Sequence, residues 1–168
     1  KKIISKIKTS FIVKNISNIK KIPVTDYIIY AANSSNNIEN LKGIYNFIKI
    51  LKEDHKKTKI LFTSSGAVYG LGMIKKKFKE NEKISFKKIL RLKGYKKEYA
   101  KSKIIMENEF QKLAKKGFNI SIARLFTFIG KRIMINKDFA VTNLINQAKN
   151  SNTSKLLLNS SNNVYRGY

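Results

Sequence analysis

Tyr99 and Lys103 are four residues apart, so on a helix their phenol and ammonium groups lie one turn apart on one face. A nearby cation favours the charged form of a tyrosine, and the pair therefore suits proton exchange with a substrate hydroxyl. The spacing alone is weak support for a functional role of this pair. Four of the 36 basic residues are arginine, which leaves 32 lysines, and with 8 tyrosines chance predicts roughly 1.5 such pairs. A second pair, Tyr45 and Lys49, also occurs.

The apolar residues around each pair separate the two. One helical stripe contains Tyr99, Lys103, Met106, Phe110 and Leu113. It is apolar apart from Lys103, and lysine is almost never buried without a partner, so this stripe predicts a functional site. Tyr45 lies on another apolar stripe with Leu41 and Ile48, whereas Lys49 falls beside that stripe. We interpret Tyr45 as a core residue.

A second candidate site follows a short apolar run, Ile60–Phe62, which predicts a buried strand. The strand leads into three hydroxylated residues, Thr63, Ser64 and Ser65, and then into Gly66, which leaves room for a ligand. Open α/β sheets bind ligands beyond the carboxyl ends of their strands. Ser65 is therefore a candidate to hydrogen-bond a substrate oxygen, with an ordinary strand-to-turn junction as the alternative.

The elements that would position these residues follow from hydrophobic periodicity and turn signals. Helices are predicted from Ile38 to Leu51, from Tyr99 to the Lys115–Gly117 segment, and over Phe139–Lys149. Further strands are predicted at Ser10–Lys14, Tyr27–Ala31, Asn119–Leu125 and Lys155–Leu158. Tyr27–Ala31 is apolar throughout, which is typical of a parallel strand covered on both faces.

Length and composition bound the class of protein. The chain has 168 residues, one domain's worth, and its hydrophobic content of 42% is typical of a globular protein. No apolar run approaches the ~20 residues that span a bilayer, and no signal-peptide pattern occurs. The chain has no cysteine, and its one histidine, His55, lies between charged residues that predict a solvated turn. No ligand set for a metal is visible.

The net charge of +26 raises the alternative of a nucleic-acid-binding module. Base and phosphate recognition favours arginine, and the chain has four. Its lysines are spread along the whole chain, together with isoleucine and asparagine, a mixture that A/T-rich coding also produces. We expect nonspecific polyanion binding at low salt but no specific nucleic-acid partner.

Several segments together resemble the extended short-chain dehydrogenase/reductases, also called the NAD-dependent epimerase/dehydratase family. In order, they are Asp26–Ala32, Asn40–Gly43, Thr63–Gly70, Tyr99–Lys103, Ala123–Gly130 and Tyr165–Arg166. The resemblance implies an α/β fold, a Rossmann-like doubly wound parallel sheet truncated at both ends. Residues 1–168 would be a partial NAD(P)-binding domain without its first βαβ unit, and residues 131–168 would run into the start of the substrate-binding part.

The resemblance also implies roles for individual residues. Those implied to be catalytic are Ser65, Tyr99 and Lys103. Those implied to contact NAD or NADP are Asn15, Ile16, Ala31, Ala32, Asn40, Thr63, Ser64, Tyr99, Lys103 and Phe126. Those implied to contact substrate are Ser65, Gly66, Thr127 and Arg166, and no metal site is implied. For Asn40 a capping or solvated asparagine is the alternative. Asn15, Thr127 and Lys131 depart from the family's aspartate, asparagine and proline.

The implied reaction is hydride transfer at a carbon of a nucleotide-diphosphate sugar, by a 4-epimerase or a 4-keto-sugar reductase. A phenolate base at neutral pH needs the tyrosine pKa lowered by ~3 units from ~10, which Lys103 and a positive nicotinamide would supply. Family dehydratases have Asp-Glu where this chain has Gly66-Ala67, so a 4,6-dehydratase is disfavoured. We expect a cytoplasmic enzyme of polysaccharide biosynthesis, with no membrane partner, and the resemblance allows a homodimer.

The family's glycine-rich turn, G-x-x-G-x-x-G, has no match in the chain. We therefore expect a fragment of a longer enzyme or a gene remnant, inactive as it stands. The alternative from another class is a degenerate family member that keeps the fold without catalysis. A basic nucleic-acid-binding module is the more distant alternative.

Overall fold

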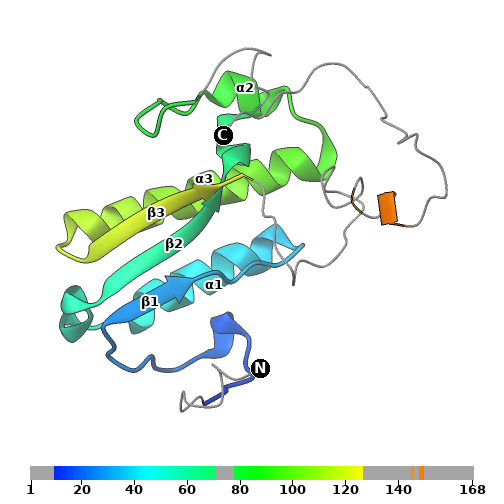
Figure 1. The fold of residues 1–168 in the computed structure, drawn as a ribbon. Helices are drawn as coiled ribbons and strands as arrows, with labels where there is room; N and C mark the ends of the chain where they lie inside the picture. The colour runs from blue at the N-terminus through cyan, green and yellow to red at the C-terminus, as the bar shows by residue number, and fades with distance from the viewer. Residues whose placement is uncertain (1–9, 71–77, 127–144, 146–147, 150–168) are drawn as a thin grey trace. The chain divides into compact units, whose positions relative to one another are not determined.

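The fold is known from a computed structural model that describes residues 10–70, 78–126, 145 and 148–149. Three strands form one parallel sheet in the order β1 (Tyr27–Tyr30), β2 (Lys59–Ser65), β3 (Asn119–Leu125) (Figure 1). Helix α1 (Asn37–Ile50) connects β1 to β2, and helix α3 (Gly94–Lys115) precedes β3. This alternation is the Rossmann-like α/β fold that the sequence predicts.

The chain divides into two compact units, and β2, α3 and β3 each pass from one unit into the other. The first unit comprises Lys1–Phe62 with Ile105–Ser121, and the second comprises Thr63–Ile104 with Ile122–Tyr168. The first therefore contains β1, α1 and the four residues of β2 that pair with β1. The second contains the end of β2 and the first half of α3.

The core of the first unit is a cluster of aromatic rings. Tyr30 of β1 packs edge-on against Phe47 of α1 and Phe110 of α3, with ring centroids 4.8 and 5.5 Å apart. Phe62 of β2 stacks on Phe110 at 4.6 Å. All four side chains are buried, so the burial of Phe110 that its helical stripe predicts is confirmed. Burial raises the pKa of Tyr30 to about 12, because an ionised phenolate here would lose its hydration.

Helix α1 turns a different face inward from the one that the sequence predicts. Its buried residues are Asn40, Gly43, Ile44 and Phe47, whereas 51% of the Tyr45 surface is exposed. The prediction that Tyr45 is a core residue is therefore wrong. Phe47 packs into the aromatic cluster, and Gly43 leaves only 2.7 Å between a Cβ built there and the Ile16 side chain. These contacts fix the rotation of the helix and leave Tyr45 beside the buried stripe.

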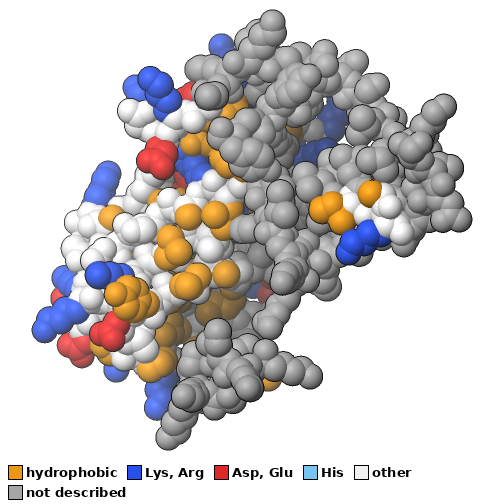
Figure 2. Space-filling view, in the orientation of Figure 1, with side chains coloured by type: hydrophobic (Ala, Val, Ile, Leu, Met, Phe, Trp, Pro, Cys, Tyr) orange, Lys and Arg blue, Asp and Glu red, His pale blue; other side chains and the backbone are white. Residues whose placement is uncertain are grey.

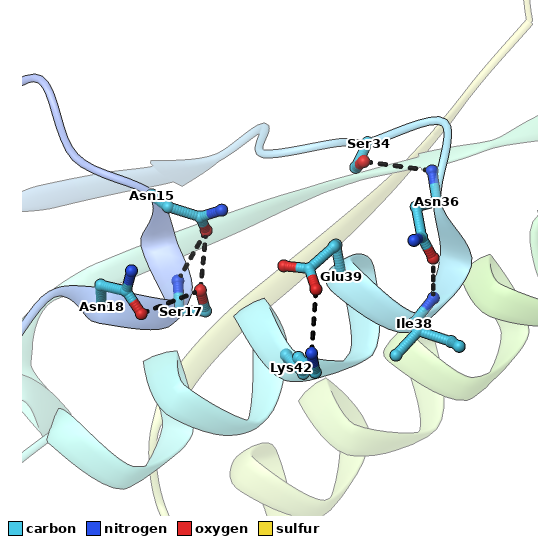
Figure 3. A network of polar contacts seen from close by, with 8 residues as sticks. All are labelled: Asn15, Ser17, Asn18, Ser34, Asn36, Ile38, Glu39 and Lys42. Carbon is cyan, nitrogen blue, oxygen red and sulfur yellow. Dashed lines mark hydrogen bonds and ion pairs between the residues drawn. The ribbon is translucent and has the colours of Figure 1, made fainter.

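The predicted strand at Ser10–Lys14 is absent, and these residues have no regular secondary structure. Phe11, Ile12 and Val13 are all largely exposed, since no strand in the described part of the chain pairs with them. A strand needs a neighbour for its backbone hydrogen bonds and for cover of its apolar side chains. The segment instead leads into a 3₁₀ turn, η2 (Ile16–Asn18), which Asn15 caps (Figure 3).

Strand β1 is covered on one face only by the residues that the structure describes. Tyr30 is buried, whereas Tyr27 and Ile29, on the opposite face, are each 67% exposed. Hydrophobic side chains are correspondingly visible at the surface over the strands in Figure 2. The expectation of cover on both faces is therefore not met. Helix α1 packs on the side of Tyr30, whereas on the other face Tyr27 and Ile29 stay largely exposed, with the Lys59 ammonium 5.3 Å from the centre of the Tyr27 ring.

His55 is buried, and the prediction of a solvated turn is wrong. It lies in a 3₁₀ turn, η3 (Glu53–Lys57), where its Nδ1 accepts a hydrogen bond from the Lys52 N–H at 3.0 Å. Its Nε2 lies 3.3 Å from the carbonyl oxygen of Ile22. A neutral ring protonated at Nε2 satisfies both contacts. His55 thus links the turn before β2 to the segment before β1.

The predicted end of the second helix is confirmed. Gly117 adopts a φ of +89°, its N–H donates to the Ala114 carbonyl, and the Phe118 N–H donates to Leu113. This pair of hydrogen bonds is the Schellman arrangement that ends helices at glycine. The strand predicted at Asn119–Leu125 is β3 itself. The predicted helix Phe139–Lys149 lies largely outside the described residues, and the predicted strand Lys155–Leu158 lies wholly outside them.

The second unit has its own apolar core beside the end of β2. A 3₁₀ turn, η4 (Gly66–Tyr69), and a short helix, α2 (Phe86–Leu90), meet the first half of α3 there. The buried core residues are Val68, Tyr69, Ile89, Leu92, Ala100 and Ile104. Gly70 ends η4 with a φ of +69°, and a Cβ built there would lie 2.8 Å from the Lys88 backbone. Only glycine allows this close approach of η4 to α2.

Candidate active site

The hydroxylated residues after Ile60–Phe62 extend strand β2 rather than end it, because the strand runs on to Ser65. Side chains alternate between the two faces of a strand. Ser64 is buried with Phe62 and Ile60, whereas Thr63 and Ser65 are half-buried on the other face. The structure therefore places Ser65 and Thr63 on the same side of the strand, and Ser64 points away from them.

Ser65 is held in place by the turn that it caps. Its side-chain oxygen accepts a hydrogen bond from the Ala67 N–H at 3.2 Å, as an N-cap residue of η4. Its φ and ψ of −139° and 146° are those of an extended strand, so strand and turn meet at this residue without strain. The Ser65 hydroxyl is consequently fixed at the carboxyl end of β2.

Lys103 is almost completely buried, with 4% of its surface exposed. Its ammonium donates a hydrogen bond to the Thr63 carbonyl at 3.3 Å and lies 5.6 Å from the centre of the Tyr99 ring. Met106 and Leu113 on the same stripe are also buried, which confirms the predicted inward face. A charged group in such a place needs compensating partners, and the Thr63 carbonyl and the Tyr99 ring provide part of that compensation.

Tyr99 is half-buried and has opposing influences on its pKa. Burial, the largest, raises the pKa above the usual 10, a hydrogen bond with Ser65 lowers it, and the neighbouring Tyr95 raises it. The net direction is upward, so the phenol is protonated at neutral pH in this structure. This is opposite to the lowering that a phenolate base requires. The lowering influence of Ser65 nevertheless indicates that its side chain lies beside the Tyr99 phenol at the end of β2.

Phe126 packs directly on Gly66. A Cβ built on Gly66 would come within 2.5 Å of the aromatic ring, closer than real Cβ atoms approach a neighbour. The Phe126 ring therefore fills the space that the missing side chain of Gly66, the residue after Ser65, leaves open. The structure thus assembles six predicted site residues in the second unit: Thr63, Ser65, Gly66, Tyr99, Lys103 and Phe126.

The sequence did not single out Tyr69, Arg124 or Tyr95, which also surround this region. Arg124 donates to the Tyr69 hydroxyl at 2.9 Å and to the Glu80 carbonyl at 3.3 Å. The Tyr69 ring stacks between Phe78 and Phe126, with centroids 4.5 and 6.0 Å away. Tyr95 could have been found from its spacing, since it stands four residues before Tyr99. The stack on Tyr69 joins residues distant in sequence, and no local pattern predicts it.

The remaining cofactor candidates belong to the first unit. The Asn40 side chain is buried and bonds both ways with the Ser34 backbone, accepting from its N–H at 2.6 Å and donating to its carbonyl at 2.9 Å. It therefore holds the loop after β1 and does not cap α1, which Asn36 does (Figure 3). Ala31 and Ala32 lie in that same loop, directly after β1.

Asn15 and Ile16 meet helix α1. The Asn15 side-chain oxygen accepts hydrogen bonds from the Ser17 N–H and hydroxyl at 3.0 and 2.9 Å (Figure 3). The amide NH₂ of Asn15 is the part of this side chain suited to an acceptor atom of adenine. Asn46 of α1 donates to the carbonyls of Ile16 and Ile19, both at 2.8 Å, and so fixes the turn. Ile16 itself contacts Gly43 through its side chain.

The donor groups of the second unit fit a dinucleotide cofactor. A buried ammonium and two hydroxyls, from Lys103, Tyr99 and Ser65, match a ligand that is rich in hydroxyl groups and carries negative charge. The predicted substrate contacts Thr127 and Arg166 lie outside the described residues, as does Lys131. None of the helices in the described ranges is long and apolar enough to cross a membrane.

Comparison with protein families identifies a match. The sequence model of a family described as "NAD dependent epimerase/dehydratase family" matches residues 26–166, which is most of the chain. A comparison with curated proteins found no match. The matched range contains β1, β2 and β3 and every residue that the structure assembles at the candidate site.

Proposed function

Because the chain belongs to the NAD dependent epimerase/dehydratase family, we propose that Ser65, Tyr99 and Lys103 form the proton-transfer centre of an NAD(P)-dependent nucleotide-sugar enzyme. The observation that carries this proposal is the almost completely buried Lys103, whose ammonium lies 5.6 Å from the centre of the Tyr99 ring. The reactions we favour are epimerisation at C4 and reduction of a 4-keto sugar. The same proposal places the enzyme in the cytoplasm.

Each residue has one task in this proposal. NAD(P), when bound, supplies or accepts the hydride. Tyr99 gives the phenol proton to the keto oxygen as that oxygen gains charge, or takes a hydroxyl proton in the reverse direction. Ser65, whose side chain lowers the Tyr99 pKa, directs its hydroxyl toward the same substrate oxygen. Lys103 stabilises the phenolate left on Tyr99.

The raised pKa of Tyr99 bears on the direction of the reaction. A protonated phenol at neutral pH is ready to donate, which suits reduction of a keto group. Oxidation of a hydroxyl needs the pKa lowered by roughly 3 units, which corresponds to about 4 kcal/mol. Lys103 and the positive charge of an oxidised nicotinamide are the groups that we assign to this lowering.

The contact between Gly66 and Phe126 supports the choice against a 4,6-dehydratase. That reaction would place an acidic residue at position 66, and the Phe126 ring occupies the space of any side chain there. Ala67 follows in η4, with its N–H bonded to Ser65. An acid at residue 66 would have to displace the ring beside the active site.

The test uses the product of the complete reading frame that encodes residues 1–168, with a panel of nucleotide sugars and both NAD⁺ and NADPH. A 4-epimerase interconverts two sugars with no net change in the cofactor, whereas a 4-keto-sugar reductase consumes NADPH in proportion to product. Failure to bind either cofactor or to turn over any sugar would contradict the proposal. That outcome favours the alternative, a degenerate family member without catalysis.

A further inference from the structure

Tyr95 stands one turn before Tyr99 on helix α3, and Lys103 stands one turn after it. The two tyrosine rings are stacked, with centroids 5.8 Å apart and an angle of 24° between their planes. The Lys103 ammonium lies 5.6 Å from the centre of the Tyr99 ring. Because Tyr95 and Lys103 are one turn away in opposite directions, they contact Tyr99 from opposite ends along the helix.

Stacking on Tyr95 limits the rotation of the Tyr99 side chain. The phenol has two torsions, and its hydroxyl reaches Ser65 only for a narrow range of both. A ring held between a second ring and an ammonium keeps these torsions before any ligand arrives. Catalytic groups need this kind of prior placement, because small errors of position cost large factors in rate.

We propose that Tyr95 is a positioning residue for Tyr99. The Tyr95 ring holds the Tyr99 ring in the orientation in which the Tyr99 hydroxyl reaches Ser65. The inference rests on the proposed role of Tyr99 in proton transfer and extends it to a residue outside the matched Tyr-x-x-x-Lys segment. Tyr95 is 57% exposed, so the apolar core of the unit does not need its ring. The stacked contact with Tyr99 is the interaction that accounts for a large aromatic side chain here.

The charges around Tyr99 agree with this placement. Among the described residues, Ser65 at the end of β2 and Tyr95 on α3 influence the Tyr99 pKa, and the Lys103 ammonium lies 5.6 Å from the centre of the Tyr99 ring. Burial raises the Tyr99 pKa, the Ser65 hydrogen bond lowers it, and ionisation of Tyr95 raises it further. The Tyr95 hydroxyl therefore lies close enough for its ionised form to raise the Tyr99 pKa.

A purely structural role is the competing explanation. Tyr95 lies in the first turn of α3, directly after Gly94 with its φ of +53°, and a contact there could simply hold the start of the helix. Such a role changes stability but leaves the pKa and surroundings of Tyr99 unaltered. The two explanations therefore differ in what happens to Tyr99.

The experiment measures Tyr99 directly in the chain of residues 1–168, by NMR with ¹³Cζ-labelled tyrosine. The Tyr99 resonance is assigned with Tyr99→Phe. Three variants are compared: Tyr95→Phe, which keeps the ring and removes the hydroxyl; Tyr95→Leu, which removes the ring; and the control Tyr45→Leu. Tyr45 is a matched control because it is a similarly exposed helical tyrosine, 51% exposed, with a lysine one turn later.

The inference predicts that Tyr95→Phe lowers the Tyr99 pKa, because the opposing charge is gone. It predicts that Tyr95→Leu weakens the nuclear Overhauser contacts between Tyr99 and Ser65, with Tm falling no further than in Tyr45→Leu. If both Tyr95 variants leave the Tyr99 pKa and contacts unchanged, Tyr95 does not position Tyr99. These readouts need neither cofactor nor substrate, so absence of turnover in the panel above contradicts the proposed function and leaves this result standing.

Discussion

At the scale of single residues, Gly66 shows how closely the candidate site is packed. Its missing side chain makes room for the Phe126 ring, which in turn stacks with Tyr69. The Ser65 hydroxyl is fixed by the adjacent turn, and the Lys103 ammonium by the Thr63 carbonyl. Apart from the aromatic stack, each of these contacts involves a residue of the proposed proton-transfer centre, Ser65, Tyr99 and Lys103, or the residue directly after Ser65.

We predict that Gly66→Ala destabilises the chain by about 1–3 kcal/mol, because the added methyl group overlaps the Phe126 ring. The measurement is the free energy of unfolding from urea titration, followed by circular dichroism. The control is the same substitution in a Phe126→Leu background, where a smaller side chain faces residue 66 and the additional cost of Gly66→Ala should shrink. An equal cost in both backgrounds would show that the two residues do not interact.

The residue types of the site could be predicted from sequence, because a tyrosine and a lysine at helical spacing on an apolar face already indicate buried chemistry. The contacts of Asn40 and Asn15 could not be predicted from sequence, because an asparagine uses the same amide groups to bind a loop backbone or a ligand. Arg124 and Tyr69 were missed for another reason. They are far apart in sequence, and tertiary packing alone brings the guanidinium to the phenol.

At the scale of elements, a short 3₁₀ turn makes buried contacts that its sequence does not indicate. Turn η3 presents His55 to the interior, where the ring joins Lys52 to Ile22. The charged residues beside His55 predict exposure to solvent, and Glu53, Asp54 and Lys57 are indeed exposed, but one residue of a 3₁₀ turn can face inward while its neighbours face out. Local charge is therefore a poor guide to the burial of a single side chain.

We predict that His55→Ala lowers the free energy of unfolding by about 1–3 kcal/mol, because the Lys52 N–H and the Ile22 carbonyl lose their partner. His55→Asn is the matched variant, since its side-chain oxygen can still accept from Lys52 at the position of Nδ1. It should recover part of the loss. A change within experimental error for His55→Ala in thermal or urea unfolding would show that the ring is not a structural link.

The helices and strands themselves were mostly predictable, and the exceptions have physical causes. The end of α3 follows from Lys115, Lys116 and Gly117, a purely local signal. The buried face of α1 does not follow from local sequence. Tyr45 and Ile44 are both large and apolar, and only tertiary contacts determine which of them is buried. The Ser10–Lys14 segment has strand-forming residues, but a strand depends on a neighbour that its own sequence does not contain.

At the scale of the whole molecule, alkaline pH tests the aromatic core. The Tyr30 pKa is raised to about 12 by burial, against about 10 in the unfolded chain. The stability linked to this group is fully present below pH 10 and is lost as pH rises toward 12. We predict that wild-type stability falls between pH 10 and pH 12 by about 2 kcal/mol more than that of Tyr30→Phe, as measured by urea unfolding at several pH values. Parallel curves for the two proteins would contradict the assignment.

The net charge of +26 gives a second prediction at this scale. Basic side chains are scattered over the described part of the face seen in Figure 2, with acidic and uncharged side chains between them. We predict that binding to duplex DNA, measured by fluorescence anisotropy, collapses between about 50 and 200 mM salt, as it does for nonspecific contacts with phosphates. Tight binding that persists at about 200 mM salt and depends on DNA sequence would favour the nucleic-acid-binding alternative.

The most direct test of the central claim is the turnover of Tyr99→Phe in the product of the complete reading frame, on the nucleotide sugar that the panel identifies. We predict that kcat falls by roughly 10²–10⁴-fold, because the phenol proton is lost while the ring remains. Tyr45→Phe, at the other Tyr-x-x-x-Lys pair, should keep wild-type kcat. Near-normal turnover of Tyr99→Phe would contradict the claim that Tyr99 moves the proton.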